Sequence, residues 1–271
     1  MIPTSATLSR DALTEQTSFI IDLDGTLYRG RNTLPGAIEF VDALVRLERR
    51  FVLCSNNSSI TPAERLERLR AMGFDLQSEH VVTSLDVLIE HLKTHWSGKR
   101  VYALATRSVE EFLESSGVAL GLPADVVVLT YDTELTYKKL VDAHQLLKAG
   151  MGFIATHPDV VCPTEHGDIP DLGSFLALLA ASTDRNPEIL GKPHKPMLDF
   201  ALKRMGGRRE DVVVLGDRLY TDIRMANDAG LRSMLVLTGE AKREDLFGTK
   251  YQPTYVVPSV RELLPLLPPQ R

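Results

Sequence analysis

The stretch FIIDLDGTLYRG, residues 19–30, joins a short apolar run to two carboxylates and a glycine. Residues 19–21 have the apolar character of a buried strand, and this strand would end at Asp22. Residues two apart on a strand point to the same side, so Asp22 and Asp24 face together if the strand geometry extends that far. Gly25 lets the chain turn away without a side chain in the way. The stretch therefore predicts a buried strand that delivers two acidic groups to one place.

Apolar runs alternate with amphipathic segments along the rest of the chain. Capping boxes are predicted at Thr61–Glu64 and Ser108–Glu111, and residues 157–170, with three prolines and a glycine, are expected to form a long loop. Alternation of this kind indicates right-handed βαβ units and a parallel sheet, and hence an α/β fold. The expected strands lie at 51–55, 101–105, 126–131, 151–156, 188–191, 212–217 and 233–239, and the expected helices at about 35–45, 62–73, 136–149, 172–182, 196–205 and 219–229.

Polar residues stand where several of these strands end. Asp22, Ser55 and Asp217 close three apolar runs, and the run EILG leads into Lys192. Ligands on parallel sheets bind beyond the carboxyl ends of the strands. We therefore expect these residues, from distant parts of the chain, to form one site.

The residue types at these strand ends suit a metal ion and a phosphate. Asp22, Asp24 and Asp217 supply hard oxygen ligands of the kind that Mg²⁺ prefers, and without a cation three like charges in a partly buried site would repel one another. Lys192 is a compact point charge that suits a phosphoryl group. The remaining expected phosphate ligands are the hydroxyl of Ser55 and the amides of Asn56 and Asn57.

Four stretches in order resemble the four motifs of the haloacid dehalogenase superfamily. They are DLDGT (22–26), SNN (55–57), GKP (191–193) and GDRLYTDI (216–223). More narrowly, the chain resembles the NagD-type, or p-nitrophenylphosphatase-like, branch of that superfamily. This closer resemblance rests on LYRG (27–30), SNNSS (55–59), LTYKKL (135–140), FIATHPD (153–159) and GKPHKPM (191–197).

The resemblance implies a two-step phosphatase. Asp22 would be the nucleophile that forms an aspartyl-phosphate, and Asp24 would protonate the leaving oxygen and later activate water. This chemistry requires one carboxylate to be ionised while its neighbour is protonated at the same pH. An acid at the position of Asp24 marks the phosphatases of the superfamily, so hydrolysis is the expected outcome.

The resemblance also implies how the remaining groups act. Mg²⁺ would be held by the carboxylate of Asp22, the backbone carbonyl of Asp24 and Asp217, and would neutralise charge on the transferring group. Ser55 and Lys192 would bind the phosphoryl oxygens. Asp222 would lie one layer further out and orient Lys192 or a metal-bound water.

An inserted cap completes the implied architecture. Residues 1–83 and 187–271 would form a Rossmann-like, doubly wound core, and residues 84–186 an inserted α/β cap that could mediate a homodimer. The loop 156–170 is a candidate for contacts with the leaving group, through His157, Asp159, Cys162 and Glu165. In the run 170–174, Asp171 stands where related proteins tend to have glycine, which leaves the substrate open among sugar phosphates, nucleotides, pyridoxal phosphate, and glycolate or glycerol phosphate.

Composition excludes several other classes. The chain has 271 residues and a formal net charge of −5, so no global basic field favours nucleic acid. Cys54 and Cys162 form no CxxC pair, which argues against a zinc finger or a disulfide framework. The first residues are polar, and no apolar run reaches the roughly 18 residues that a membrane helix needs, so we expect a cytoplasmic protein without membrane contact.

Two alternatives stay open at this point. A receiver-type signalling module also uses Mg²⁺, aspartates, Ser/Thr and Lys on a parallel sheet, but it has no place for an insertion of about 100 residues. A receiver would be phosphorylated once, whereas an enzyme would release phosphate many times. A metal-independent dehalogenase of the same superfamily would keep its activity in a chelator.

Overall fold

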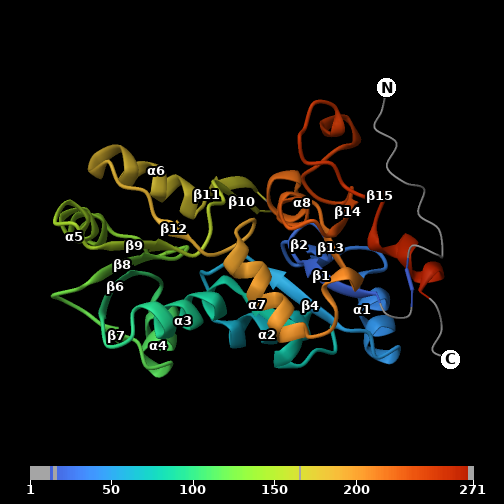
Figure 1. Cartoon of the computed structure of the whole chain (residues 1–271), viewed down its shortest axis with the longest axis horizontal. Helices are drawn as coiled ribbons and strands as arrows, with labels where there is room; N and C mark the ends of the chain where they lie inside the picture. The colour runs from blue at the N-terminus through green and yellow to red at the C-terminus, as the bar shows by residue number, and fades with distance from the viewer. Residues whose placement is uncertain (1–12, 15–16, 165, 268–271) are drawn as a thin grey trace. The chain divides into compact units, whose positions relative to one another are not determined.

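The computed structural model describes residues 13–14, 17–164 and 166–267 (Figure 1). The first unit consists of Met1–Ser55, Leu66–Val82 and Leu198–Arg271, and the second of Asn56–Arg65 and Thr83–Met197. The second unit thus contains more residues than the predicted insertion at 84–186, and the added residues include Asn56, Asn57 and Lys192.

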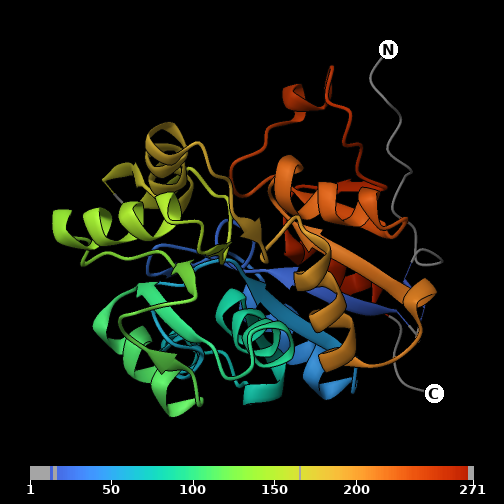
Figure 2. The ribbon, with the colours of Figure 1, turned by 60° about the vertical axis from the view of Figure 1, so that its left-hand side comes forward.

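A six-stranded sheet organises the first unit, in the order β15-β14-β13-β1-β4-β5. The pairings of β1 with β4 and β13, of β13 with β14, and of β14 with β15 are parallel, which confirms the predicted α/β fold. Figure 2 shows β1 and β4 (blue) beside β13 (orange). The strands are β1 (Ser18–Asp22), β4 (Phe51–Ser55), β5 (Val81–Thr83), β13 (Val212–Gly216), β14 (Arg232–Val236) and β15 (Tyr255–Val257).

The central strands of this sheet are buried along their whole length. All five residues of β4 and of β13 are buried, as expected for parallel strands covered on both faces. Helix α1 (Ala37–Arg46) buries Phe40, Val41 and Leu44 along one face, and the ring of Phe40 meets that of Phe19 edge-on at 5.9 Å. Each such apolar side chain contributes about 1.5–3 kcal/mol when it leaves water. The strand ends are therefore held on a rigid core.

Other helices, strands and turns of the described residues lie outside the two large sheets. They are the strands β2 (Tyr28–Arg29) and β3 (Asn32–Thr33), the helices α2 (Pro62–Ala71), α7 (Lys195–Met205) and α8 (Arg224–Asp228), the π-turn η4 (Leu219–Ile223), and the 3₁₀ turns η2 (Ser78–His80), η3 (Arg209–Asp211), η5 (Arg243–Leu246) and η6 (Val260–Leu266).

The second unit is built on a five-stranded parallel sheet in the order β12-β9-β8-β6-β7. Its apolar core joins this sheet to helices α5 and α6, through residues such as Val127, Leu147 and Leu179. Its elements are α3 (Ser84–His95), β6 (Arg100–Leu104), α4 (Arg107–Ser115), β7 (Ala119–Leu120), β8 (Val126–Leu129), α5 (Tyr137–Lys148), β9 (Gly152–Ala155), β10 (Val161–Thr164), β11 (Gly167–Pro170), α6 (Leu172–Thr183) and β12 (Glu188–Ile189).

One predicted capping box is confirmed and the other is wrong. Thr61 N–H donates to Glu64 Oε2 at 2.7 Å, and Glu64 N–H donates back to Thr61 Oγ1 at 3.2 Å. The box at Ser108 does not form, because α4 begins one residue earlier, at Arg107. The Arg107 N–H donates instead to the Glu134 carboxylate, from the loop before α5, at 2.9 Å. A carboxylate from another segment thus replaces the local cap.

The predicted long loop at 157–170 is also wrong in its second half. Residues 161–164 and 167–170 form the antiparallel pair β10–β11, in which Val161 pairs with Pro170 and Thr164 with Gly167. Prolines are tolerated here because a two-stranded ribbon leaves outward-facing positions that need no N–H donor.

Among the residues that the structure describes, no helix is long and apolar enough to cross a membrane.

Candidate active site

Three of the predicted strand ends lie side by side in the first unit. Asp22 is the last residue of β1 and pairs in register with Cys54, so Ser55 follows one position along on β4. On the other side of β1, Ile21 pairs with Leu215, two residues before Asp217. Chain order reverses at this point, because β1 lies between β4 and β13. Such a switch point is where parallel sheets bind ligands.

The fourth strand end belongs to the other sheet. Lys192 was expected where the run EILG ends, and that run contributes β12, a strand of the second sheet. Strand β12 pairs with β9 of the second unit, Glu188 with Ile154 and Ile189 with Ala155. Lys192 and the aspartates therefore belong to different units.

Three carboxylates gather in the first unit. Asp22, Asp217 and Asp222 each offer an oxygen, and these oxygens lie within 4.8 Å of one another. Asp217 and Asp222 are buried, with 2% and 1% exposure, while Asp22 is half-buried. The carboxylate of Asp24 is not part of this group. Three buried or half-buried acids this close are stable as anions only with a compensating positive charge.

The carboxylate of Asp217 is fixed by the backbone around it. Its Oδ2 accepts the N–H of Glu240 at 2.7 Å, whereas its Oδ1 is buried without a hydrogen-bond partner in the described part of the chain. A Cβ at Gly25 would lie 2.3 Å from Oδ2, and one at Gly239 would lie 1.8 Å from it. Burial, and then the neighbouring charge of Asp22, raise the pKa of Asp217 well above its ordinary value.

Hydroxyl groups orient the two carboxylates of the DLDGT stretch. Thr26 Oγ1 donates to Asp22 Oδ2 at 3.1 Å, and the hydroxyl of Tyr28 donates to Asp24 Oδ2 at 3.1 Å. Thr26 and Tyr28 are completely buried, so these donors are held in place. Gly25 adopts a φ of 88°, which lets its N–H donate to the Tyr28 carbonyl at 2.8 Å. Asp22 and Asp24 are thus presented in fixed orientations.

Asp222 reaches the cluster from the π-turn η4. Its Oδ2 accepts the hydroxyl of Thr221 at 3.2 Å and the N–H of Arg218 at 3.4 Å. A Cβ at Gly216 would lie 2.3 Å from the Asp222 Cγ, so glycine is needed where β13 ends. Single π-type turns of this kind are frequent at functional sites.

Sequence reasoning missed residues 238–240, the segment that holds Asp217. Thr238 Oγ1 donates to the Gly25 carbonyl at 2.7 Å, and the Arg29 guanidinium donates to the carbonyls of Thr238 and Gly239 at 3.3 and 3.1 Å. The segment follows β14, which neighbours β13 in the sheet. Applying the strand-end rule to SMLVLTG, as to the other strands, could have found it.

Asn56 and Lys192 are joined within the second unit. The Lys192 N–H donates to Asn56 Oδ1 at 2.7 Å, and Asn56 Nδ2 donates to the Lys192 carbonyl at 3.0 Å. Asn56 Nδ2 also donates to the carboxylate of Asp159, at 3.1 Å to Oδ2 and 3.3 Å to Oδ1. The side-chain amide of Asn56 is therefore committed to Lys192 and Asp159. Its neighbour Asn57 accepts the N–H and the hydroxyl of Ser59 through its Oδ1.

The loop residues suggested for the leaving group are differently placed. His157 is completely buried and Asp159 is 6% exposed, whereas Cys162 is partly exposed. The fourth, Glu165, lies outside the described residues. Asp159 Oδ2 approaches Nδ1 of His157, and Asp171 Oδ1 approaches Nε2, each at 3.7 Å. The two carboxylates thus approach different nitrogens of one ring.

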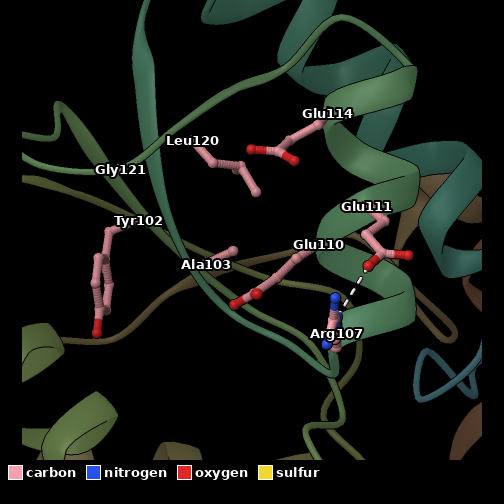
Figure 3. Close-up of a pocket in the computed structure, with 8 residues that line it drawn as sticks. All are labelled: Tyr102, Ala103, Arg107, Glu110, Glu111, Glu114, Leu120 and Gly121. Atoms are coloured by element: carbon pink, nitrogen blue, oxygen red, sulfur yellow. Dashed lines mark hydrogen bonds and ion pairs between the residues drawn. The ribbon is translucent and has the colours of Figure 1, made fainter.

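A pocket of about 430 Å³ lies elsewhere in the second unit, between α4 and the strands β6 and β7. Figure 3 shows Glu110 and Glu114 projecting from α4 into this space, while Arg107 is paired with Glu111 at 3.0 Å. Burial raises the pKa of Glu110. A pocket lined by three glutamates and one paired arginine is electrostatically unsuited to a phosphate ester.

Comparison with known proteins gives consistent family matches. A family model described as haloacid dehalogenase-like hydrolase matches residues 19–119, and one described as HAD-hydrolase-like matches residues 189–263. The 5'-nucleotidase YutF of Bacillus subtilis is 31% identical over 250 residues, which cover 92% of this chain and 98% of the relative. These matches include all four motif stretches.

Solved structures agree with these matches. The 4-nitrophenylphosphatase of Thermotoga maritima is 38% identical, with a TM-score of 0.87 and coverage of 94% of this chain and 97% of that one. A glycerol phosphate phosphatase of Mycobacterium tuberculosis, solved in complex with calcium, is 32% identical. Its TM-score is 0.84, and the match covers 92% of this chain and 75% of that one. The predicted likeness to p-nitrophenylphosphatases is confirmed.

Proposed function

This chain belongs to the haloacid dehalogenase-like hydrolases and is a phosphatase, and from that premise we propose that it is a Mg²⁺-dependent phosphomonoesterase for small phosphorylated metabolites. The observation that carries the proposal is the group of Asp22, Asp217 and Asp222 at a switch point of the parallel sheet. Half-buried Asp24 stands two residues beyond Asp22 on the same stretch.

The carboxylates fit a hard divalent cation. Asp217 keeps one buried oxygen without a hydrogen-bond partner in the described part of the chain, and Asp22 and Asp222 bring further oxygens within 4.8 Å. Oxygen-only ligands favour Mg²⁺ over softer metals. Asp22 and Asp217, with the backbone carbonyl of Asp24, would hold the ion. When bound, it supplies positive charge that offsets the charge of the transferring phosphoryl group.

The reaction would take place in two displacements. In the first, a carboxylate oxygen of Asp22 attacks phosphorus, the ester P–O bond breaks, and Asp24 gives its proton to the leaving oxygen. In the second, water attacks the phosphorus of the aspartyl-phosphate while Asp24 takes a proton from it. The bond between Asp22 and phosphorus breaks, and inorganic phosphate leaves. The hydroxyls of Thr26 and Tyr28 hold the two carboxylates in orientation for these steps.

The phosphoryl oxygens would be bound by Ser55 and Lys192, with Asn56 and Asn57 in the same segment as Ser55. The substrate would be a sugar phosphate, a nucleotide, pyridoxal phosphate, or glycolate or glycerol phosphate. Two relatives support parts of this range, since one is named a 5'-nucleotidase and another a glycerol phosphate phosphatase. The inserted residues 84–186 would act as the cap that selects among these esters.

Phosphate release from p-nitrophenyl phosphate and a panel of these esters, with Mg²⁺ and with EDTA, tests the proposal. We expect repeated turnover with Mg²⁺ and none with EDTA. Turnover that persists in EDTA would contradict the metal requirement and favour a metal-independent enzyme. A single stoichiometric phosphorylation without release would contradict hydrolysis. Folded protein with no activity on any ester would refute the proposed substrate class.

A further inference from the structure

A buried polar network in the second unit centres on the side-chain amide of Asn56. One end of this amide accepts the Lys192 N–H at 2.7 Å. The other end donates to the Lys192 carbonyl at 3.0 Å and to the carboxylate of Asp159 at 3.1 Å. All three residues are at most 6% exposed. Asp159 has no part in the two displacements described above, so its burial calls for another explanation.

A buried carboxylate costs free energy unless it is hydrogen-bonded or paired with a charge. Asp159 meets the first condition, because Asn56 donates to it, and the ring of His157 lies 3.7 Å from its Oδ2. Asp171 lies against the opposite ring nitrogen of His157 and accepts the N–H of Leu172. The ring of His157 thus lies between two acids, with Asp159 at Nδ1 and Asp171 at Nε2.

Asp159 controls which way the Asn56 amide points. A carboxylate only accepts hydrogen bonds, whereas an amide has a donating and an accepting end of similar size. With Asp159 in place, Nδ2 must face Asp159, and Oδ1 is then left to accept the Lys192 N–H. If the amide flipped, its NH₂ group would confront that N–H and both hydrogen bonds to Lys192 would be lost.

The chain around Lys192 is packed too closely to adjust. A Cβ at Gly191 would lie 2.4 Å from the Thr156 carbonyl oxygen and 2.6 Å from Asn56 Oδ1. The backbone of Asp159 is anchored as well, because its carbonyl accepts the N–H of Gly173 at 2.7 Å. A change in the Asn56 amide would therefore be transmitted to the backbone of Lys192.

We propose that Asp159, backed by His157, is a positioning residue that sets the backbone of Lys192 through the side-chain amide of Asn56. The proposal rests on the proposed function, because it takes Lys192 as a ligand of the phosphoryl group. It differs from the expectation that the segment 156–170 contacts the leaving group. A residue that acts through Lys192 affects binding of the phosphoryl group, which all the substrates share. A contact with the leaving group would instead affect each substrate differently.

Kinetics of Asp159→Ala on the ester panel test this distinction. We expect kcat/KM to fall by about ten- to a hundredfold, since small displacements of a positioned group have effects of this size. The factor should be the same for p-nitrophenyl phosphate, a nucleotide and a sugar phosphate. For Asp159→Asn, kcat/KM should fall less than for Asp159→Ala, because the asparagine restores an acceptor for Asn56, although it does not fix the direction of the Asn56 amide. Factors that differ widely among the esters would overturn the proposal.

A double-mutant cycle tests whether Asp159 acts through Asn56. Once Asn56→Ala has removed the amide, Asp159→Ala should cause little further loss, because residues in one network are non-additive. Losses that multiply would overturn the proposal. Asp75→Ala, at an exposed carboxylate on the loop after α2, is the matched control and should leave kcat/KM unchanged.

Hydrogen exchange of the Lys192 amide gives a readout that is independent of turnover. This N–H should exchange faster in Asp159→Ala than in the wild type, and Asp75→Ala should have no effect. Unchanged exchange would overturn the proposal even if activity fell. If the wild type shows no Mg²⁺-dependent turnover, the proposed function fails, and the exchange result alone decides whether Asp159 positions Lys192. Should Asp159→Ala not fold, Asp159→Asn takes its place in both measurements.

Discussion

Replacing Gly239 by alanine should damage the site without damaging the fold. A Cβ at this position would lie 1.8 Å from Asp217 Oδ2, 2.3 Å from Cγ and 2.6 Å from Cβ. Real Cβ atoms essentially never approach a neighbour closer than 3.0 Å. Since the Asp217 Cβ is itself in the way, rotation of the side chain cannot relieve the overlap. The backbone of one of the two segments must move.

The expected magnitude follows from that displacement. The carboxylate must shift by about 1 Å, and a shift of this size in a functional group can cost about 100-fold in rate. This loss corresponds to about 2.7 kcal/mol in the activation free energy. We therefore expect kcat/KM to fall about 100-fold. The Mg²⁺ concentration needed for half-maximal rate should rise, because Asp217 is a proposed ligand.

The assay is hydrolysis of p-nitrophenyl phosphate over a range of Mg²⁺ concentrations, with thermal unfolding measured on the same samples. Gly230→Ala is the control, because its φ of +67° strains any other residue while no atom lies within 4 Å of the added Cβ. It should lose about 1–2 kcal/mol of stability and keep its activity. If Gly239→Ala keeps the wild-type rate and Mg²⁺ dependence, the bracing of Asp217 does not matter to the reaction.

Other substitutions in the first unit test its remaining groups. Asp22→Asn should abolish phosphate release while the thermal midpoint is maintained, and normal turnover would remove Asp22 as the nucleophile. Burial, and then the charge of Asp22, raise the pKa of Asp217, so the folded chain binds this proton more tightly than the unfolded chain does. In EDTA the charged Asp217 therefore destabilises the fold increasingly as the pH rises from the ordinary aspartate value towards the raised pKa. The stability gained by Asp217→Asn in urea unfolding should then grow as the pH rises above the ordinary aspartate value, and a gain that shrinks would contradict the assignment. Tyr28→Phe removes the hydroxyl that orients Asp24 and should lower kcat more for alkyl phosphates than for p-nitrophenyl phosphate, whose leaving group needs little protonation. Equal effects on the two ester classes would mean that Tyr28 does not act through Asp24.

Local patterns in the sequence were sufficient to predict most elements. The apolar run before Asp22, the proline-opened helix after Thr61 and the amphipathic helix at 137–148 are each set by residues close in the chain. Strand pairing is not local. Glu188 and Ile189 form a strand of two residues, and no feature of two residues says which sheet they join. The partner is chosen by packing against β9, so the placement of Lys192 could not be predicted.

The contacts that brace the site were hidden for a different reason. Asp217 is held by the backbone N–H of Glu240, which any residue other than proline would supply, so the residue type gives no signal. The pairing of Asn56 with Lys192 spans 136 positions in the chain. Asparagine after a strand suggests a turn or a ligand contact, and only the structure shows both ends of its amide engaged. Sequence patterns therefore indicated the proposed reacting groups more readily than the groups that hold them.

The charge distribution of the first unit bears on how substrate and metal would bind. Asp22, Asp217 and Asp222 form a negative cluster that would repel a phosphate ester, and the chain as a whole carries a net charge of −5. Repulsion of this kind is removed when a divalent cation occupies the cluster. The cation and the phosphate must therefore favour each other's binding, and linkage makes the effect equal in both directions. The buried carboxylates that destabilise the metal-free fold would thus make phosphate binding conditional on the metal.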